Sequence, residues 1–166
     1  MNAIEIAIRM ETDAIKFYRE SAEKVSHPVG KKMFLTIVED EKRHLAALSH
    51  IFKEVGVSYK EASPMKSVKT VFEALKDQMK KRVAATTDEL ESFKIAMEME
   101  KEGVEFYKKF ASEAKVEKEK TLFEKLIKEE EQHFAIFSNT YNFLRDSGNW
   151  FMWDEYSIVD GGTPWA

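Results

Sequence analysis

Glutamate and histidine side chains recur in this sequence in a pattern that suits metal chemistry. Glu41 and His44 stand three residues apart, and Glu130 and His133 repeat that spacing 89 residues later (130 − 41 = 89). Residues three apart on a helix are surface neighbours, so each pair would present a carboxylate and an imidazole together. Oxygen and imidazole ligands without a thiolate suit iron or manganese better than a structural zinc site.

These two pairs belong to a longer internal repeat. A gap-free alignment at the same offset places AIRMETDAIKFY over AMEMEKEGVEFY, and FLTIVEDEKRHLAALS over FEKLIKEEEQHFAIFS. The other polar identities of interest are Glu11 with Glu100 and Tyr18 with Tyr107. We interpret the repeat as a duplicated helical hairpin that packs with pseudo-two-fold symmetry.

The repeated acids are predicted to face the protein interior. Glu11 shares a helical stripe with Ile4, Ile8 and Ile15, because steps of four and seven return to one face of a helix. Burying uncompensated carboxylates is costly, and neighbouring ones repel each other. Either protons or cations must neutralise them, and the −4 charge of four glutamates matches two divalent ions. A metal-free scaffold with protonated carboxylates is the remaining alternative.

Neighbouring acids leave the choice of ligands open. Asp40 and Glu129 would pair with His44 and His133 at a spacing of four, and Glu98 and Glu102 flank Glu100. We prefer Glu41 and Glu130, because the spacing of three matches the Glu-x-x-His pattern of two-metal carboxylate bundles. His27 and His50 have no histidine counterpart in the repeat and are interpreted as surface or packing residues.

Two repeated tyrosines are candidates for orienting the ligands. Tyr18 and Tyr107 follow Glu11 and Glu100 by seven residues, which is two turns or roughly 10.5 Å along a helix. Neither hydroxyl can reach the glutamate of its own helix. On antiparallel neighbouring helices, however, each hydroxyl would reach a ligand carboxylate, and a buried tyrosine hydroxyl needs such a partner.

Four long helical segments must position these residues. Apolar residues recur at helical spacing over about residues 2–25, 31–55, 87–111 and 117–144. Pro28 and Gly30 are expected in the first turn between helices, and Thr86 and Glu89 have the spacing of a capping box. Short turns within each hairpin and a long connection between them predict an all-α, ferritin-like four-helix bundle. A shorter amphipathic run after Pro64 predicts a short helix in that connection.

The chain is expected to form a bundle domain over residues 1–145 and an aromatic extension over 146–166. The extension holds all three tryptophans and should pack on the bundle or on a partner subunit. The KKR cluster at 80–82 is interpreted as the solvated end of the connecting helix. A net charge of −4 argues against nucleic-acid binding, which needs a basic surplus. Without a signal peptide or a long apolar stretch, we expect a cytoplasmic protein with no membrane association.

The motifs resemble those of the rubrerythrin branch of the ferritin-like superfamily. The resemblance covers residues 2–144 and rests on Glu11, Tyr18, Glu41-Lys-Arg-His44, Glu100, Tyr107 and Glu130-Glu-Gln-His133. It implies two iron ions, with manganese or zinc as substitutes. By this resemblance Glu41 and Glu130 would bridge the ions, Glu11 and Glu100 would be terminal ligands, and His44 and His133 would bind one ion each.

The resemblance also implies an activity and partners. Family members reduce hydrogen peroxide or dioxygen, or oxidise Fe(II), in defence against oxidative stress, and a homodimer is expected. Rubredoxin-type iron sites need four cysteines and this chain has none, so an external rubredoxin-type electron donor is implied. Rubrerythrins usually carry a further glutamate where this chain has Gly103. The alternative is a module that binds, stores or buffers iron without turnover.

Overall fold

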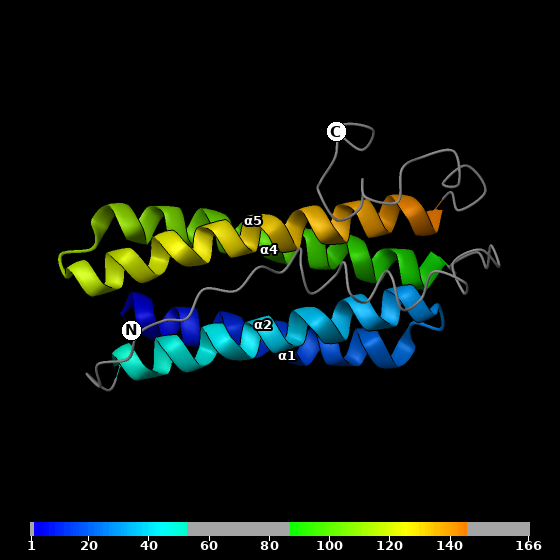
Figure 1. Cartoon of the computed structure of the whole chain (residues 1–166), viewed down its shortest axis with the longest axis horizontal. Helices are drawn as coiled ribbons and strands as arrows, with labels where there is room; N and C mark the ends of the chain where they lie inside the picture. Colours follow the sequence, from blue (N-terminus) through cyan, green and yellow to red (C-terminus); the bar gives the residue numbers. More distant parts are fainter. Residues whose placement is uncertain (1, 53–86, 146–166) are drawn as a thin grey trace.

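The computed structural model describes residues 2–52 and 87–145, and within them it contains four helices and no strand. The helices are α1 (Ala3–Lys24), α2 (Pro28–Phe52), α4 (Thr87–Glu113) and α5 (Glu117–Arg145). The prediction of an all-α bundle is therefore confirmed (Figure 1). The predicted helix after Pro64, the KKR cluster at 80–82 and the aromatic extension at 146–166 all lie outside the described residues.

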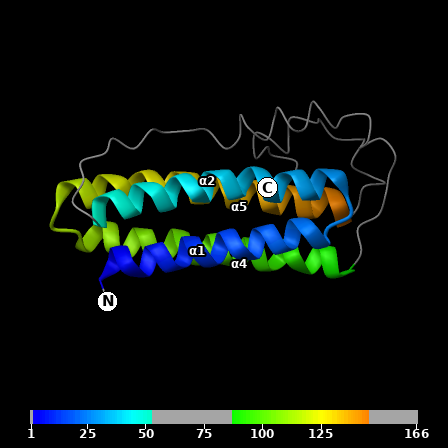
Figure 2. The same cartoon turned by 90° about the horizontal axis from the view of Figure 1, so that it is seen from below.

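The helices form two antiparallel hairpins that lie side by side. Helix α1 packs along α2, and α4 packs along α5. Turning the bundle shows α1 beside α4 on one face and α2 beside α5 on the other (Figure 2). Helix α2 ends and α4 begins at opposite ends of the bundle. None of the described helices combines the length and apolarity needed to cross a bilayer.

Helix α1 begins with a capping box. The side chain of Asn2 accepts a hydrogen bond from the backbone N–H of Glu5 at 2.9 Å, and the Glu5 carboxylate accepts one from the Asn2 N–H at 2.8 Å. These two bonds satisfy backbone donors that a helix start otherwise leaves without partners. The helix ends at Lys24, where the Val25 N–H still bonds to the carbonyl of Ser21.

The start of α2 corrects the sequence-based prediction. We expected the helix to begin near Lys31, but it begins at Pro28, so both predicted breakers lie within its first turn. Proline is suited to the first position of a helix, where its missing N–H has no intrahelical partner to lose. The N–H of Val29 donates to Nδ1 of His27 at 3.2 Å. Gly30 is helical and buried rather than part of the turn.

The turn between α1 and α2 is also tied to the start of α4. The Glu89 carboxylate accepts hydrogen bonds from the backbone N–H of Ser26 at 2.7 Å and from its hydroxyl at 2.6 Å. Thr86, the other half of the predicted capping box, lies outside the described residues. Glu89 therefore joins the two hairpins at this end of the bundle.

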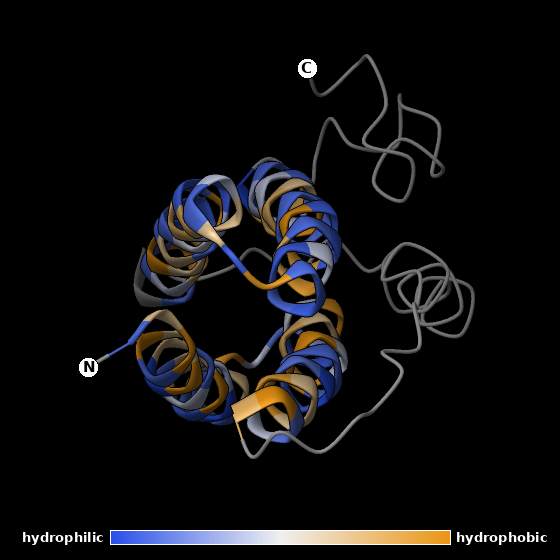
Figure 3. Cartoon of the chain, turned by 90° about the vertical axis from the view of Figure 1, so that its left-hand side faces the viewer, coloured by the Kyte–Doolittle hydropathy of each residue, from blue (hydrophilic) through white to orange (hydrophobic). Residues whose placement is uncertain are grey.

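Two apolar clusters fill the bundle and leave a polar layer between them. Viewed end-on, the four helices surround a common axis (Figure 3). One cluster includes Phe34, Phe93 and Phe137, and the other includes their repeat counterparts Phe123, Ile4 and Leu48. Tyr18 belongs to the first cluster and its counterpart Tyr107 to the second. The duplicated sequence therefore packs as a duplicated core, and the charged residues lie where the two clusters meet.

Candidate metal centre

All six predicted ligands come together at the middle of the bundle. Glu11 lies on α1, Glu41 and His44 on α2, Glu100 on α4, and Glu130 and His133 on α5, and each is between 0 and 4 % exposed. One carboxylate from each of two helices therefore meets a carboxylate and an imidazole from each of the other two. This is the donor arrangement of two-metal carboxylate bundles.

Glu41 and Glu130 occupy the centre of this cluster. Nδ1 of His44 lies 2.9 Å from Oε2 of Glu41 and 3.0 Å from Oε1 of Glu130. Nδ1 of His133 lies 3.1 Å from Oε1 of Glu41 and 3.7 Å from Oε1 of Glu130. The two imidazole rings are nearly parallel, with centroids 5.6 Å apart. Both central carboxylates thus stand between the two histidines.

The remaining two carboxylates each approach one histidine. Oε1 of Glu11 is 3.6 Å from Nδ1 of His44, and Oε2 of Glu100 is 3.5 Å from Nδ1 of His133. The donor atoms therefore form two overlapping groups, each within 4.8 Å: Glu11, Glu41, His44 and Glu130, and Glu41, Glu100, Glu130 and His133. Each group has the composition needed to hold one ion, and the two groups share Glu41 and Glu130.

The acids that precede the central glutamates lie on the outer side of the histidines. Nε2 of His44 is 3.0 Å from Oε2 of Glu129, and Nε2 of His133 is 3.0 Å from Oδ2 of Asp40. Hydrogen bonds from the histidine and from Arg43 lower the pKa of each acid, although burial by itself would raise it. An ionised carboxylate can only accept, so each Nε2 carries the proton and each Nδ1 points inward as a potential ligand atom.

Arg43 joins these two outer acids, a role that the sequence analysis missed. Its guanidinium donates to Oδ1 of Asp40 at 2.8 Å and to Oε1 of Glu129 at 2.8 Å. The residues therefore form a chain from His44 through Glu129, Arg43 and Asp40 to His133. Asp40 and Glu129 recur at the repeat offset and were weighed as ligands, whereas Arg43 corresponds to Gln132 and gave no repeat signal.

The two tyrosines reach across to the neighbouring hairpin. The Tyr18 hydroxyl donates to Oε1 of Glu100 at 2.6 Å, and the Tyr107 hydroxyl donates to Oε1 of Glu11. Both rings are fully buried. The contacts are those that antiparallel packing of α1 and α4 would allow, and they restrain the two outer carboxylates of the cluster.

The cluster is electrostatically strained by its own carboxylates. Burial, together with repulsion from Glu11 and Glu100, raises the pKa of Glu41 to about 8. Burial and the same neighbours also raise the pKa of Glu130 well above its ordinary value. Burial would raise the pKa of Glu11 too, but the neighbouring Glu41 and His44 side chains lower it to about 2.

Several potential metal-ligand atoms at the centre have no hydrogen-bond partner within the described residues. They are both carboxylate oxygens of Glu41, Oε2 of Glu100, Oε1 of Glu130 and Nδ1 of His133. Buried polar atoms are normally paired, because an unpaired one keeps its full desolvation cost. Cations at the centre would satisfy these atoms and offset the carboxylate charge, so the residues present fit a pair of divalent ions.

The histidines without a repeat counterpart lie away from the centre. His27 is 2 % exposed and packs edge-on against Phe143, with ring centroids 5.7 Å apart. His50 is partly exposed near the end of the described part of α2. Their interpretation as packing or surface residues agrees with these positions, and His27 additionally accepts the hydrogen bond at the start of α2.

A comparison with protein families agrees with this geometry. The rubrerythrin family model matches residues 2–141 of the chain. Neither a curated protein nor a solved structure matches the chain significantly. The family match spans both hairpins and every residue of the buried carboxylate and histidine cluster. This chain therefore belongs to the rubrerythrin family.

Proposed function

We propose that this protein is a di-iron oxidoreductase that reduces hydrogen peroxide or dioxygen. The observation that carries the proposal is the pair of overlapping buried groups, each with three carboxylates and one imidazole, that share Glu41 and Glu130. Donor sets of oxygen and imidazole without thiolate suit iron. Membership of the rubrerythrin family supports the same metal.

The residues of the chain would bind and orient the metals. Glu41 and Glu130, which both groups share, would help to hold both ions, with Glu11 and His44 at one of them and Glu100 and His133 at the other. Two bound ferrous ions would supply the two electrons that convert hydrogen peroxide and two protons into two water molecules. The Tyr18 and Tyr107 hydroxyls would hold the outer carboxylates in place through their hydrogen bonds.

Re-reduction of the centre would need an external electron donor. The 166 residues contain no cysteine, so they cannot form a rubredoxin-type iron site of their own. A small rubredoxin-type protein is the donor that the family membership favours.

Metal content tests the binding half of the proposal. Anaerobic loading with Fe(II) should leave about two ions per chain, measured by elemental analysis. Glu130→Gln should lose bound iron, because an amide keeps the shape of the side chain but cannot be ionised. Glu131→Gln is a matched control, since Glu131 is the next residue and its side chain is 52 % exposed. Equal iron content in both variants would contradict the assignment of Glu130.

Stopped-flow absorbance tests the redox half. Diferrous protein mixed with hydrogen peroxide should oxidise much faster than free Fe(II) in the same buffer. Oxidation no faster than that of free Fe(II) would reject the enzyme and leave a module that binds or buffers iron. Storage in a mineral core would need a hollow cage, so native mass decides that alternative. A 24-mer would support storage, and the homodimer that we propose would exclude it.

A further inference from the structure

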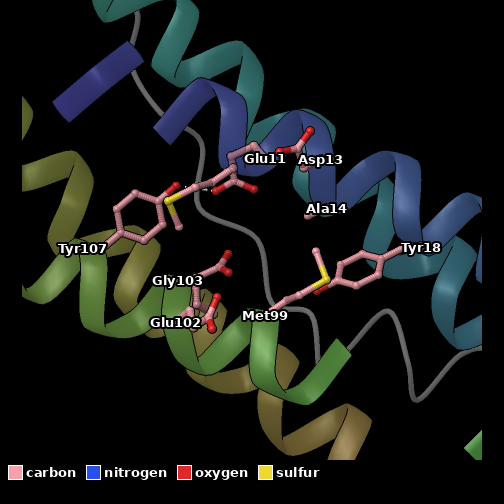
Figure 4. Close-up of a pocket in the computed structure, with 10 residues that line it drawn as sticks. Glu11, Asp13, Ala14, Tyr18, Met99, Glu102, Gly103 and Tyr107 are labelled. Atoms are coloured by element: carbon pink, nitrogen blue, oxygen red, sulfur yellow. Dashed lines mark hydrogen bonds between the residues drawn. The ribbon is translucent and has the colours of Figure 1, made fainter. Parts of the chain in front are cut away.

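A pocket between α1 and α4 leads from the surface to one side of the carboxylate cluster (Figure 4). Its volume is about 170 Å³. Tyr18 and Tyr107 lie at its two ends, and the exposed residues Asp13 and Glu102 lie on the solvent side. The full lining is Met10, Glu11, Asp13, Ala14, Tyr18, Met99, Glu102, Gly103, Tyr107 and Glu130.

The residues that form the walls of the pocket are related by the internal repeat, whereas the residues at its inner end are not. Met10 with Met99, Asp13 with Glu102, Ala14 with Gly103, and Tyr18 with Tyr107 are all repeat counterparts. Glu11 and Glu130 line the pocket, whereas their counterparts Glu100 and Glu41 do not. The pocket therefore reaches only one half of a pseudo-symmetric cluster, the half that contains Glu11 and Glu130.

The Ala14 and Gly103 pair accounts for this asymmetry. A Cβ atom placed on Gly103 would lie 3.1 Å from Oε2 of Glu130. The missing methyl group therefore leaves space directly over the Glu130 carboxylate. Ala14 carries the methyl group that Gly103 lacks, and the repeat relation predicts that this methyl group lies at the equivalent place over Glu41.

We infer that the α1–α4 pocket is the route by which small molecules reach the metal centre, and that Gly103 opens it toward the ion held by Glu11, Glu41, His44 and Glu130. The inference rests on the proposed function and adds that the two ions differ in accessibility. The acidic side chains on the solvent side disfavour anions, and the methionines make the walls apolar. The route therefore suits neutral molecules of a few atoms, the class to which hydrogen peroxide and dioxygen belong.

Nitric oxide is a suitable probe, because it is neutral, small and changes the visible spectrum of ferrous iron. Its association with the diferrous protein can be followed by anaerobic stopped-flow absorbance, without any turnover. Gly103→Ala should slow association about tenfold, because protein interiors are close-packed and the added methyl group would fill the space over the Glu130 carboxylate. Ala14→Gly should make the second ion react fast as well. The double variant Ala14→Gly with Gly103→Ala should again show fast association at one ion only.

The outcomes separate this inference from the proposed function. Failure of the wild-type protein to bind about two iron ions would reject the proposed function itself. A Gly103→Ala variant that holds two ions and binds nitric oxide at the wild-type rate would overturn the route. If the added methyl group displaces Glu130 and releases iron, the Ala14→Gly variant still tests the route, because it removes a methyl group and cannot crowd a ligand. A variant that shows no additional fast-reacting ion would overturn the role of the Ala14 and Gly103 pair.

Discussion

At the scale of single residues, neighbouring acids in the same helix have opposite tasks. Glu41 lies among the inward-facing histidine nitrogens, whereas Asp40 holds the outer nitrogen of His133. In the same way, Glu130 lies beside the inward-facing nitrogen of His44, and Glu129 contacts the outer nitrogen of His44. One step along a helix rotates a side chain by about 100°. Adjacent carboxylates therefore reach different sides of the imidazoles and are not interchangeable.

Arg43 is expected to affect iron binding although it does not reach the centre. Arg43→Met would remove the cation between Asp40 and Glu129 and loosen both histidines. Fe(II) affinity should fall about 10–100-fold, the usual effect of losing such an outer partner. Competition with a chromophoric chelator measures the affinity. Lys42→Met is the matched control, because Lys42 is 42 % exposed and forms an ion pair with the surface residue Glu39. Equal affinities would contradict the positioning role.

His27 should make stability depend on pH. Burial lowers its pKa below 6.5, although Glu89 opposes the shift, and the neutral ring accepts the Val29 hydrogen bond. Just below pH 6.5 the unfolded chain therefore binds more protons at His27 than the folded chain does. The contribution of neutral His27 to the free energy of unfolding is complete above pH 6.5 and declines as the pH falls. His27→Asn keeps a capping side chain without titrating. In urea unfolding of metal-free protein, the wild type should lose more stability than this variant between about pH 7.5 and 5.5. Equal losses of unfolding free energy in the wild type and in His27→Asn would contradict the role of His27.

At the scale of helices, close approach explains a residue that the sequence analysis placed in a turn. A Cβ atom on Gly30 would lie 2.9 Å from Cγ1 of Val25 and 3.2 Å from Cζ of Phe93. Both neighbours are buried and cannot move into solvent. Gly30 therefore lets the start of α2 pack closely against the end of α1 and against α4.

Gly30→Ala should accordingly destabilise the protein. Overpacking costs about 1–3 kcal/mol, which exceeds the roughly 0.5–1 kcal/mol that alanine gains over glycine inside a helix. Gly103→Ala in the metal-free protein is a useful contrast, because its new methyl group meets only a carboxylate end at 3.1 Å. Urea midpoints of both variants should show a clear loss for Gly30→Ala and little change for Gly103→Ala. A Gly30→Ala variant as stable as the wild type would refute the packing argument.

At the scale of the whole molecule, the bundle surrounds a charged layer with two apolar clusters. The buried carboxylates of this layer oppose folding unless positive charge accompanies them. Protons on Glu41 and Glu130 would supply part of it, because burial and repulsion between the carboxylates raise the pKa of both residues. Iron would supply the rest, so the stability of the fold and the occupancy of the centre should be linked.

Iron should therefore raise the unfolding temperature. Free Fe(II) at about 100 times its dissociation constant adds about 2.7 kcal/mol when it binds only the folded state, which corresponds to roughly 5–10 °C for a chain of this size. Anaerobic calorimetry with and without Fe(II) measures the shift, and excess chelator should reverse it. Glu130→Gln should show a much smaller shift than Glu131→Gln. A shift of equal size in both variants would place the stabilising ions elsewhere.

The sequence by itself determined the architecture and the residues that meet at its centre. Helical periodicity identified four long helices, and the offset of 89 residues related Glu11, Glu41 and His44 to Glu100, Glu130 and His133. These features can be predicted from the sequence, because helical periodicity and an internal repeat are both patterns of residue order along the chain. The match to the rubrerythrin family agrees with them.

Only the tertiary structure decided how those residues are arranged. Asp40 and Glu41 both lie near His44 in sequence, and helix packing determined which of them faces the centre. Arg43 and Gly103 break the repeat, and their roles depend on side chains of another helix, Glu129 of α5 for Arg43 and Glu130 of α5 for Gly103. The position of Gly30 inside α2 likewise depends on contact with Val25 and Phe93. The physical reason is common to all of these cases: distances between residues far apart in the chain are set by packing, which spacing along the sequence does not contain.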